Sequence, residues 1–180
     1  MEVPTLHCRN FILRPWCQED AEALVRHANN PRIAGNLRDA FPHPYSLTDA
    51  RSWLKAVSTD PSSVVLALEI DGEAAGGIGL TPMSDVYRLN GEVGYWLSEK
   101  HWGKGIMTEA VAALVEHAFT KTGLMRLFAG VFENNPSSMR VLEKNGFVRE
   151  SVHKRAVIKE GIRMDEHYFA LLREDWSPRS

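Results

Sequence analysis

One segment in the second half of the chain combines two glycines, a lysine and a helix start in a spacing that suits anion binding. Residues 102 to 108 read Trp-Gly-Lys-Gly-Ile-Met-Thr, between a strand pattern and a helix pattern. The first amides of a helix lack intrahelical partners and carry partial positive charge. Glycines allow the backbone to curl closely around an anion. The segment therefore predicts a cradle for a phosphate or pyrophosphate.

The two most familiar phosphate loops do not fit this segment. A P-loop needs Gly-x-x-x-x-Gly-Lys-Ser/Thr, but Lys104 is followed by Gly105 and no glycine stands five residues before Gly103. A dinucleotide-binding turn needs Gly-x-Gly-x-x-Gly, and position 108 is threonine. A plain strand-to-helix turn remains open as the alternative interpretation of these glycines.

The elements that must position this segment alternate between strand and helix patterns. Asp71-Gly72 and Asn90-Gly91 are predicted hairpin turns, and Lys159-Glu160-Gly161 is a predicted turn between the last two strands. Strands are predicted over residues 9–14, 64–70, 73–80, 92–97, 124–132, 147–157 and 162–172. Helices are predicted over 19–28, from a cap at Ser46 or Thr48 through Val57, over 107–118, and from Pro136 behind the N-cap Asn135 to just before Gly146. Asn29-Asn30-Pro31 is predicted to end the first of these helices.

The resulting order is β-α-α-β-β-β-α-β-α-β-β, which predicts an α+β fold with a mixed, mostly antiparallel sheet and helices on both faces. The segment from Glu92 to Phe132 is the one predicted parallel crossover. We expect residues 1–180 to form a single domain, because 180 residues without a linker-like tract suit one domain.

Composition narrows the function classes. Apolar residues make up 44% and charged residues 24%, with a formal net charge of −2, so we expect no nucleic-acid partner. No apolar run approaches the ~20 residues of a membrane helix, and the N-terminus lacks a signal-peptide pattern, so we expect a cytoplasmic protein without membrane contact. Cys8 and Cys17 are expected to be reduced thiols. The histidines and cysteines lack metal-ligand spacing, so we expect no metal.

The glycine segment resembles the acetyl-CoA pyrophosphate motif, Gln/Arg-x-x-Gly-x-Gly/Ala, of the GNAT family of N-acetyltransferases. It is most similar to the branch that includes the ribosomal-protein acetyltransferases RimJ and RimL. Trp102 stands where the motif has Gln or Arg, and Met107 replaces its small last residue. Residues 135–147 resemble the second CoA-contacting helix, and residues 93–97 resemble the central strand. The predicted element order also matches the family fold.

The resemblance implies acetyl-CoA as co-substrate and assigns its contacts. Main-chain contacts to the pantetheine arm are implied for Trp96 and Leu97, with a further contact from Asn135, whose type also suits a plain N-cap. The pyrophosphate contacts fall on the cradle itself, which comprises Trp102, Gly103, Lys104, Gly105, Ile106, Met107 and Thr108.

Acetyl transfer to an amine needs a group that accepts the ammonium proton and a group that protonates the departing thiolate. Glu92, at the start of the central strand, is the candidate base, and Glu69 on a neighbouring strand is the alternative. A solvated carboxylate is an equally good interpretation of Glu92. Ser138 resembles the serine that the branch places near the CoA sulfur, where it would also contact the cofactor. Tyr168 is a second candidate acid, or a core aromatic residue.

The resemblance places the amine acceptor between the first two helices and the last two strands. Asn36, Phe41, Tyr45 and Asp165 are the predicted acceptor contacts. The favoured acceptor is a protein or peptide N-terminal α-amine, with direct attack in a ternary complex. Small amines such as an antibiotic, a polyamine or an amino acid remain open, as does a non-catalytic acyl-CoA-binding regulator or an unrelated nucleotide binder. Monomer and homodimer are both consistent with the sequence.

Overall fold

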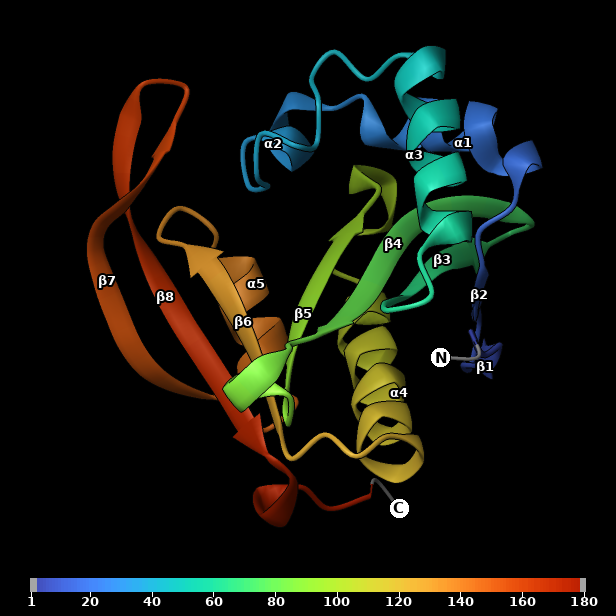
Figure 1. The fold of residues 1–180 in the computed structure, drawn as a ribbon. Helices are drawn as coiled ribbons and strands as arrows, with labels where there is room; N and C mark the ends of the chain where they lie inside the picture. The colour runs from blue at the N-terminus through green and yellow to red at the C-terminus, as the bar shows by residue number, and fades with distance from the viewer. Residues whose placement is uncertain (1–2, 179–180) are drawn as a thin grey trace. The chain divides into compact units, whose positions relative to one another are not determined.

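The computed structural model describes residues 3–178 and confirms a mixed α+β fold (Figure 1). The strands are β1 (Leu6–His7), β2 (Ile12–Pro15), β3 (Val64–Ile70), β4 (Glu73–Pro82), β5 (Asn90–Leu97), β6 (Arg126–Phe132), β7 (Val148–Lys159) and β8 (Ile162–Leu172). The α-helices are α1 (Ala21–Ala28), α2 (Pro31–Ala34), α3 (Leu47–Thr59), α4 (Ile106–Lys121) and α5 (Pro136–Glu143). Short 3-10 turns include η1 (Gln18–Asp20), η2 (Asp85–Tyr87), η3 (Glu99–His101) and η4 (Arg173–Asp175).

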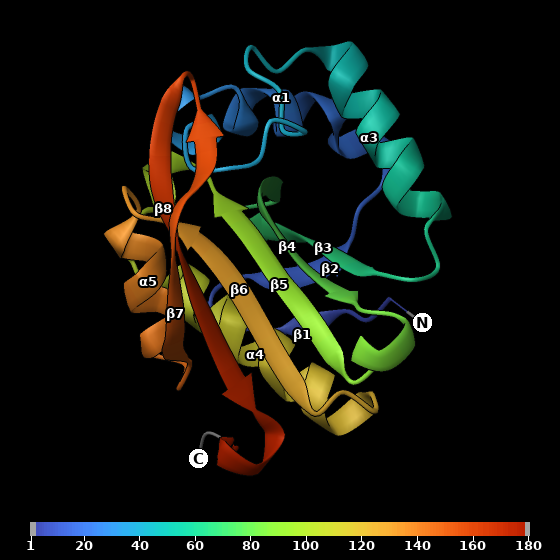
Figure 2. The same ribbon diagram turned by 60° about the vertical axis from the view of Figure 1, so that its left-hand side comes forward.

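Hydrogen bonds connect the strands in the order β1-β2-β3-β4-β5-β6-β8-β7. The start of β5 pairs in parallel with β6, with Glu92 opposite Phe128, as predicted for the α4 crossover. β6 pairs antiparallel with β8. β8 also pairs antiparallel with β7, and these two strands form the long hairpin at the end of the chain (Figures 1 and 2). The described chain divides into two compact units, residues up to 79 with 94–106, and residues 80–93 with 107 onward.

The first unit has a core between α1, α3 and the strands beside them. Leu24 and Leu54 bring the apolar faces of the two helices onto Ala67 of β3, and each is at most 1% exposed. Trp16 meets Trp53 edge-on, with ring centroids 5.1 Å apart. Ser46, one of the two predicted caps, begins α3 by accepting the Asp49 amide, while the Asp49 carboxylate accepts the Ser46 amide. This reciprocal capping fixes where α3 starts.

In the second unit, β6 separates a buried face from a more open one. Leu127, Ala129 and Val131 are buried. Phe128 and Gly130, on the opposite face, are only half-buried, and Gly130 lies beside the Glu166 side chain of β8. α4 buries one side of its length, including Leu114 and Phe119. Candidate catalytic groups on β5, β6 and β8 must therefore project from the open face.

Three predicted elements needed correction. Of the predicted strand over 9–14, only residues 12–14 are in a strand, β2, which pairs with the unpredicted β1 through a turn in which the Cys8 amide donates to the Phe11 carbonyl. The helix over 19–28 ends before Asn29-Asn30-Pro31 as predicted, but the sequence did not predict α2. That helix begins here because the Asn30 side chain accepts the Arg32 amide and proline suits the first helical position.

The Asn90-Gly91 hairpin turn is the third correction, since both residues lie inside β5 and the turn occupies residues 83–89. A side chain at Gly91 would place its Cβ 2.7 Å from a Leu80 methyl and 2.9 Å from a Leu124 methyl. Gly91 is thus required by close packing. The other predicted turns, Asp71-Gly72 and Glu160-Gly161, are confirmed by their positive φ angles.

We expect Gly91→Ala to lower the free energy of unfolding by about 1–3 kcal/mol, because it overpacks a close-packed leucine cluster. Gly94→Ala on the same strand is the matched control, since a Cβ there meets nothing within 4 Å. That control should be neutral or stabilising, as alanine restricts the unfolded chain more than glycine does. Urea denaturation measures both, and equal midpoints for the two variants would contradict the packing argument.

Candidate active site

Residues 102–105 of the predicted cradle form an exposed loop between η3 and α4, and residues 106–108 begin α4. Gly103 and Gly105 have φ angles of 74° and 78°, in the left-handed region that glycine adopts without strain. A Cβ at either position would meet nothing within 4 Å, so the backbone surface is open. Within residues 3–178, the backbone amides of residues 103–105 have no hydrogen-bond partner. Together with the first amides of α4, they can donate to one anion.

Side chains at the edges of the loop leave this surface clear. The indole Nε1 of Trp102 donates to the Leu97 carbonyl at 2.7 Å, which turns the tryptophan back toward the end of β5. Met107, the departure from the family motif, is only 7% exposed. Its bulk is directed into the interior and does not fill the loop. The Asn145 side chain donates to the Thr108 carbonyl at 3.1 Å, which ties the end of α5 to the first turn of α4.

Three other predicted residues of the first unit, Phe41, Tyr45 and Trp96, form a partly buried aromatic group. Phe41 lies 5.7 Å from Trp96 and 5.0 Å from Tyr45, measured between ring centroids. Tyr45 is 3% exposed, and burial raises the pKa of its phenol to about 12. The half-buried Phe41 and Trp96 are more accessible. The acceptor role of Tyr45 stays a prediction, although the structure places this side chain in the core cluster.

Asn36 and Glu69 have distinct surroundings in the same unit. The Asn36 amide nitrogen donates to the Arg32 carbonyl at 2.8 Å, while its Oδ1 is buried without a partner. An acceptor oxygen of this kind could receive a hydrogen bond from an amine. Glu69, the alternative base, accepts from the Arg14 guanidinium at 2.5 Å. Because Glu69 is held in an ion pair across β2 and β3, it is the poorer candidate for proton transfer.

In the second unit, two candidate catalytic residues lie on the open face of the sheet. Glu92 is half-buried and paired in register with Phe128. The Phe128 ring stacks on Tyr168, with centroids 6.4 Å apart, and Tyr168 stacks on His153 at 4.3 Å. Residues in direct register or two apart on neighbouring strands share a face. A stripe of side chains therefore runs from Glu92 across β6 to Tyr168 and His153.

Sequence reasoning missed a further carboxylate on this face, that of Glu166. A Cβ at Gly130 would lie 2.5 Å from Glu166 Oε1, so the Glu166 side chain lies across β6 at the position that glycine leaves open. Glu166 is two residues from Tyr168 on β8 and faces the same side. Only the register of β6 against β8 reveals this, since neither Gly130 nor Glu166 belongs to a recognisable motif.

Ser138 and Asn135 come together at the start of α5. The Asn135 side chain accepts the Ser138 amide at 3.1 Å, which confirms the predicted N-cap. Ser138, in the first turn of α5, is half-buried. Their predicted contacts with the pantetheine arm and the sulfur stay predictions.

Asp165 is engaged within the β7–β8 hairpin. Its carboxylate accepts from the Lys154 ammonium at 2.7 Å and from the Arg155 amide at 2.8 Å. Its own amide donates to Glu133 Oε1 at 3.1 Å. The Lys154 ammonium and the Arg155 amide hold the pKa of Asp165 below its usual value. Arg155 has a φ of 53° at a bulge in β7, so Asp165 supports this irregular backbone.

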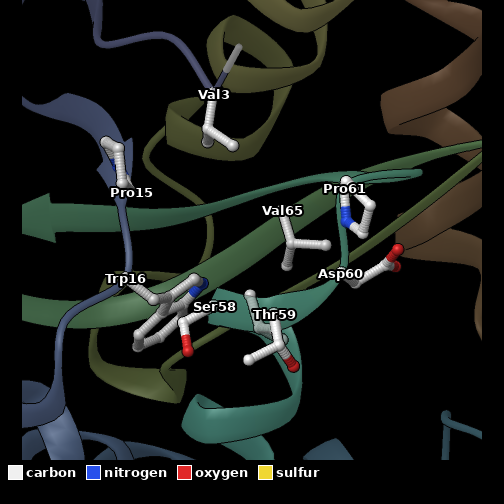
Figure 3. Close-up of a pocket in the computed structure, with 9 residues that line it drawn as sticks. Val3, Pro15, Trp16, Ser58, Thr59, Asp60, Pro61 and Val65 are labelled. Atoms are coloured by element: carbon white, nitrogen blue, oxygen red, sulfur yellow. The ribbon is translucent and has the colours of Figure 1, made fainter. Parts of the chain in front are cut away.

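A cavity of about 340 Å³ lies in the first unit, at the end of α3 (Figure 3). The lining residues are Val3, Pro15, Trp16, Val57, Ser58, Thr59, Asp60, Pro61 and Val65. The buried Trp16 Nε1 has no hydrogen-bond partner. No predicted site residue is among these lining residues. Within residues 3–178, no group of three or more His, Cys, Asp or Glu residues could hold a metal, and no helix is long and apolar enough to span a membrane.

We expect mild acid to lower the stability of the fold, because two histidines have lowered pKa values in the folded protein. Burial lowers the pKa of His101, and the ammonium groups of Lys100 and Lys104 lower it further. Burial also lowers the pKa of His117. Both histidines therefore bind a proton more readily in the unfolded chain. Their cost to stability is absent above the ordinary histidine pKa of about 6.5 and appears as the pH falls below it.

We expect the thermal midpoint to fall by a few degrees between about pH 7.5 and about pH 5. Carboxylates whose pKa is lowered, such as Glu73, lose their contribution only below about pH 4.5. A His101→Gln/His117→Gln variant should show a shallower decline over this window. Calorimetry at several pH values measures the thermal midpoint of the wild type and of the variant. An equal fall of the midpoint in both proteins would show that groups other than these histidines are responsible.

Known proteins that are similar to this chain are N-acetyltransferases. The profile of the family described as "Acetyltransferase (GNAT) domain" matches residues 10–148. The probable N-acetyltransferase YjcK of Bacillus subtilis is 46% identical over 83 residues, a match that covers 46% of each chain. YdaF of Bacillus subtilis, provisionally named a ribosomal N-acetyltransferase, is 30% identical, over 83% of this chain and 76% of that protein.

Two further relatives differ in their named substrates and ligands. The spermidine N(1)-acetyltransferase of Escherichia coli is 28% identical, over 81% of this chain and 75% of the relative. The solved structure of Mycobacterium smegmatis RimJ in complex with CoA-disulfide superimposes with a TM-score of 0.83 at 26% identity, and the match covers 94% of this chain and 85% of RimJ. Because the family profile spans most of the chain, from β2 through α5, the protein belongs to the GNAT family of N-acetyltransferases.

Proposed function

We propose that the protein transfers the acetyl group of acetyl-CoA to the α-amine of a protein or peptide N-terminus, by direct attack in a ternary complex. The observation that carries the cofactor assignment is the loop at 103–105, with two positive-φ glycines, an open backbone surface and amides without recorded partners. A pyrophosphate fits such a loop, since it can accept several amide hydrogen bonds at once. The RimJ structure, solved with CoA-disulfide, supports the same assignment.

The cofactor contacts proposed for this chain follow from these positions. The amides of residues 103–108 would hold the pyrophosphate. Trp96 and Leu97, at the end of β5, would bind the pantetheine arm through their main chain. The Leu97 carbonyl already accepts the Trp102 indole, so its second lone pair or the neighbouring Trp96 groups would make this contact. Acetyl-CoA supplies the acetyl thioester.

The chemistry proposed for the open face is proton transfer at both ends of the reaction. An N-terminal amine, with an ordinary pKa near ~8, is mostly protonated at neutral pH and must lose a proton before it attacks. Glu92 would accept that proton, directly or through water. The new bond joins the amine nitrogen to the acetyl carbon while the carbon–sulfur bond breaks. The Ser138 hydroxyl, or that of Tyr168, would donate a proton to the departing sulfur.

A single amine suits the predicted acceptor contacts better than a polycation does. Asn36, Phe41 and Tyr45 are uncharged, and the one carboxylate in the set, Asp165, is paired with Lys154. Binding of several positive charges would need several available carboxylates. The relative provisionally named a ribosomal N-acetyltransferase supports a protein acceptor. The spermidine N(1)-acetyltransferase relative keeps small amines as the second candidate.

The test is release of free CoA thiol from acetyl-CoA with a panel of acceptors. The panel holds peptides with varied N-terminal residues, the same peptides with a blocked N-terminus and a lysine, polyamines and aminoglycosides. We expect turnover with free N-termini and none with the blocked peptides. Turnover confined to polyamines or aminoglycosides would transfer the assignment to a small amine. Binding of acetyl-CoA without turnover on any acceptor would favour the non-catalytic regulator.

We also propose that residues 1–180 act as one domain in the cytoplasm. The family profile covers β2 through the start of β7 as one continuous match, across both compact units. The oligomeric state can be measured on the same preparation by light scattering, with monomer and homodimer as the two expected masses.

A further inference from the structure

The residues that precede the cradle are connected to α1 by a buried hydrogen-bond chain. Ser98, 6% exposed, begins η3, and its hydroxyl lies 3.0 Å from Nδ1 of His27 on α1. Nε2 of His27 lies 3.0 Å from the Glu73 carboxylate at the start of β4. The Ser98 amide donates to the Ala75 carbonyl at 2.8 Å. Ser98 is therefore fixed at both its main chain and its side chain.

A second, more exposed connection joins the same loop to α2. The Asn30 side chain caps α2 through its oxygen and donates from its nitrogen to Glu99 at 2.7 Å. The Arg32 guanidinium also donates to Glu99, and it lies over the Trp102 ring, 5.1 Å from the centroid. Trp102 in turn donates to the Leu97 carbonyl. Glu99 and Trp102 are thus both held by residues at the start of α2.

Residues 98–102 are attached to α1 and α2, whereas residues 103–105 are exposed and have no recorded amide partner. A loop whose amides must all point at one anion loses conformational freedom when it binds, and that loss weakens binding. Attachment of the preceding residues reduces the freedom that remains to be lost. The two connections therefore act on residues 98–102, which lead directly into the glycine loop at 103–105.

We infer that Ser98 and Glu99 are positioning residues, which hold the loop in its pyrophosphate-binding conformation through the α1–α2 segment. This inference rests on the proposed use of acetyl-CoA. It gives His27, Asn30 and Arg32 a supporting role in cofactor binding, because their side chains contact Ser98 or Glu99. The segment after α2 carries Asn36, whose side chain donates to the Arg32 carbonyl, so the same connection reaches a predicted acceptor contact.

Because the second connection is exposed, its effect on CoA binding can be measured without a large effect on folding. The side chains of Arg32 and Glu99 are 66% and 38% exposed. Exposed ion pairs of this kind contribute little to the stability of a fold. Removal of the Arg32–Glu99 ion pair should therefore leave the thermal midpoint nearly unchanged and should mainly weaken CoA binding by the loop.

The experiment measures dissociation constants of CoA and of pantetheine by calorimetry or ligand-observed NMR. Pantetheine lacks the pyrophosphate and the nucleotide, so it does not depend on the cradle. We expect Glu99→Ala to weaken CoA binding about tenfold and pantetheine binding less than about twofold. Arg32→Ala combined with Glu99→Ala should weaken CoA binding by less than the sum of the two single effects, because the pair acts as one connection.

Glu150→Ala is the matched control, since Glu150 accepts from Arg126 in another exposed ion pair, outside the loop. It should leave both dissociation constants unchanged. Ser98→Ala tests the buried connection and should also weaken CoA binding more than pantetheine binding. If the wild-type protein does not bind CoA, the proposed function fails. If the wild-type protein binds CoA and Glu99→Ala binds it equally well, or loses both ligands equally, the positioning inference is wrong.

Discussion

Replacing Gly105 with glutamate is expected to weaken acetyl-CoA binding at least about 100-fold. Gly105 has a φ of 78°, where any other L-residue is strained, at a cost of about 1–2 kcal/mol. The new carboxylate would also stand beside the pyrophosphate, and like charges in contact cost several kcal/mol. Isothermal titration of acetyl-CoA into wild type and variant measures the loss.

Gly161→Glu is the control for Gly105→Glu, because it combines the same charge with nearly the same backbone conformation. Gly161 has a φ of 80° in the β7–β8 turn, and a Cβ there meets nothing within 4 Å. Its strain is therefore matched, but it lies outside the cradle. The control should bind acetyl-CoA as the wild type does. Retained affinity in Gly105→Glu would remove the cradle from the binding site, whereas equal losses in both variants would point to general destabilisation.

Replacing Glu92 with glutamine is expected to lower kcat about 100-fold near neutral pH, within the usual range for loss of a general base. Glutamine preserves the size of the side chain but does not accept the ammonium proton at this pH. The dissociation constant for acetyl-CoA should stay within about twofold, because Glu92 is assigned to the amine and not to the cofactor. The residual rate should rise with pH toward the pKa of the peptide amine, near ~8, as the amine itself becomes neutral.

Glu166→Gln is the companion variant for this prediction. Glu166 lies on the same open face of the sheet and carries the carboxylate that crosses Gly130. Steady-state kinetics of both variants with one peptide acceptor, over a range of pH, distinguishes the two carboxylates. A large loss in Glu166→Gln with normal turnover in Glu92→Gln would transfer the role of base to Glu166.

Most of the fold was predictable from local patterns along the chain. The strand at 64–70, the Asp71-Gly72 turn and the α4 helix have periodicities and turn residues that act over a few neighbours, and the structure contains all three. The N-cap at Asn135 likewise depends on the three residues that follow it. These features are readable because their stabilising contacts are close in sequence.

The failures occurred where distant residues decided the outcome. Asn90-Gly91 has the composition of a hairpin turn, but Gly91 is needed where leucines of β4, β6 and the segment before β6 converge. Asn30-Pro31 looked like a helix end alone, although the Asn30 side chain both caps α2 and reaches Glu99, 69 positions away. Local preference is a weak guide where tertiary packing supplies the larger energy.

The candidate site divides in the same way. The sequence by itself predicted the loop that is proposed as the cradle, since Gly103 and Gly105 stand just before a helix start and can take their positive φ angles without strain. The tertiary structure alone decided the neighbours of each candidate group: Glu69 is paired with Arg14, Tyr45 is buried in a core, and Asp165 is bound to Lys154. It also revealed Glu166 and the attachment of Ser98 to His27. Side-chain environments depend on strand register and helix packing, which bring together residues that no local pattern relates.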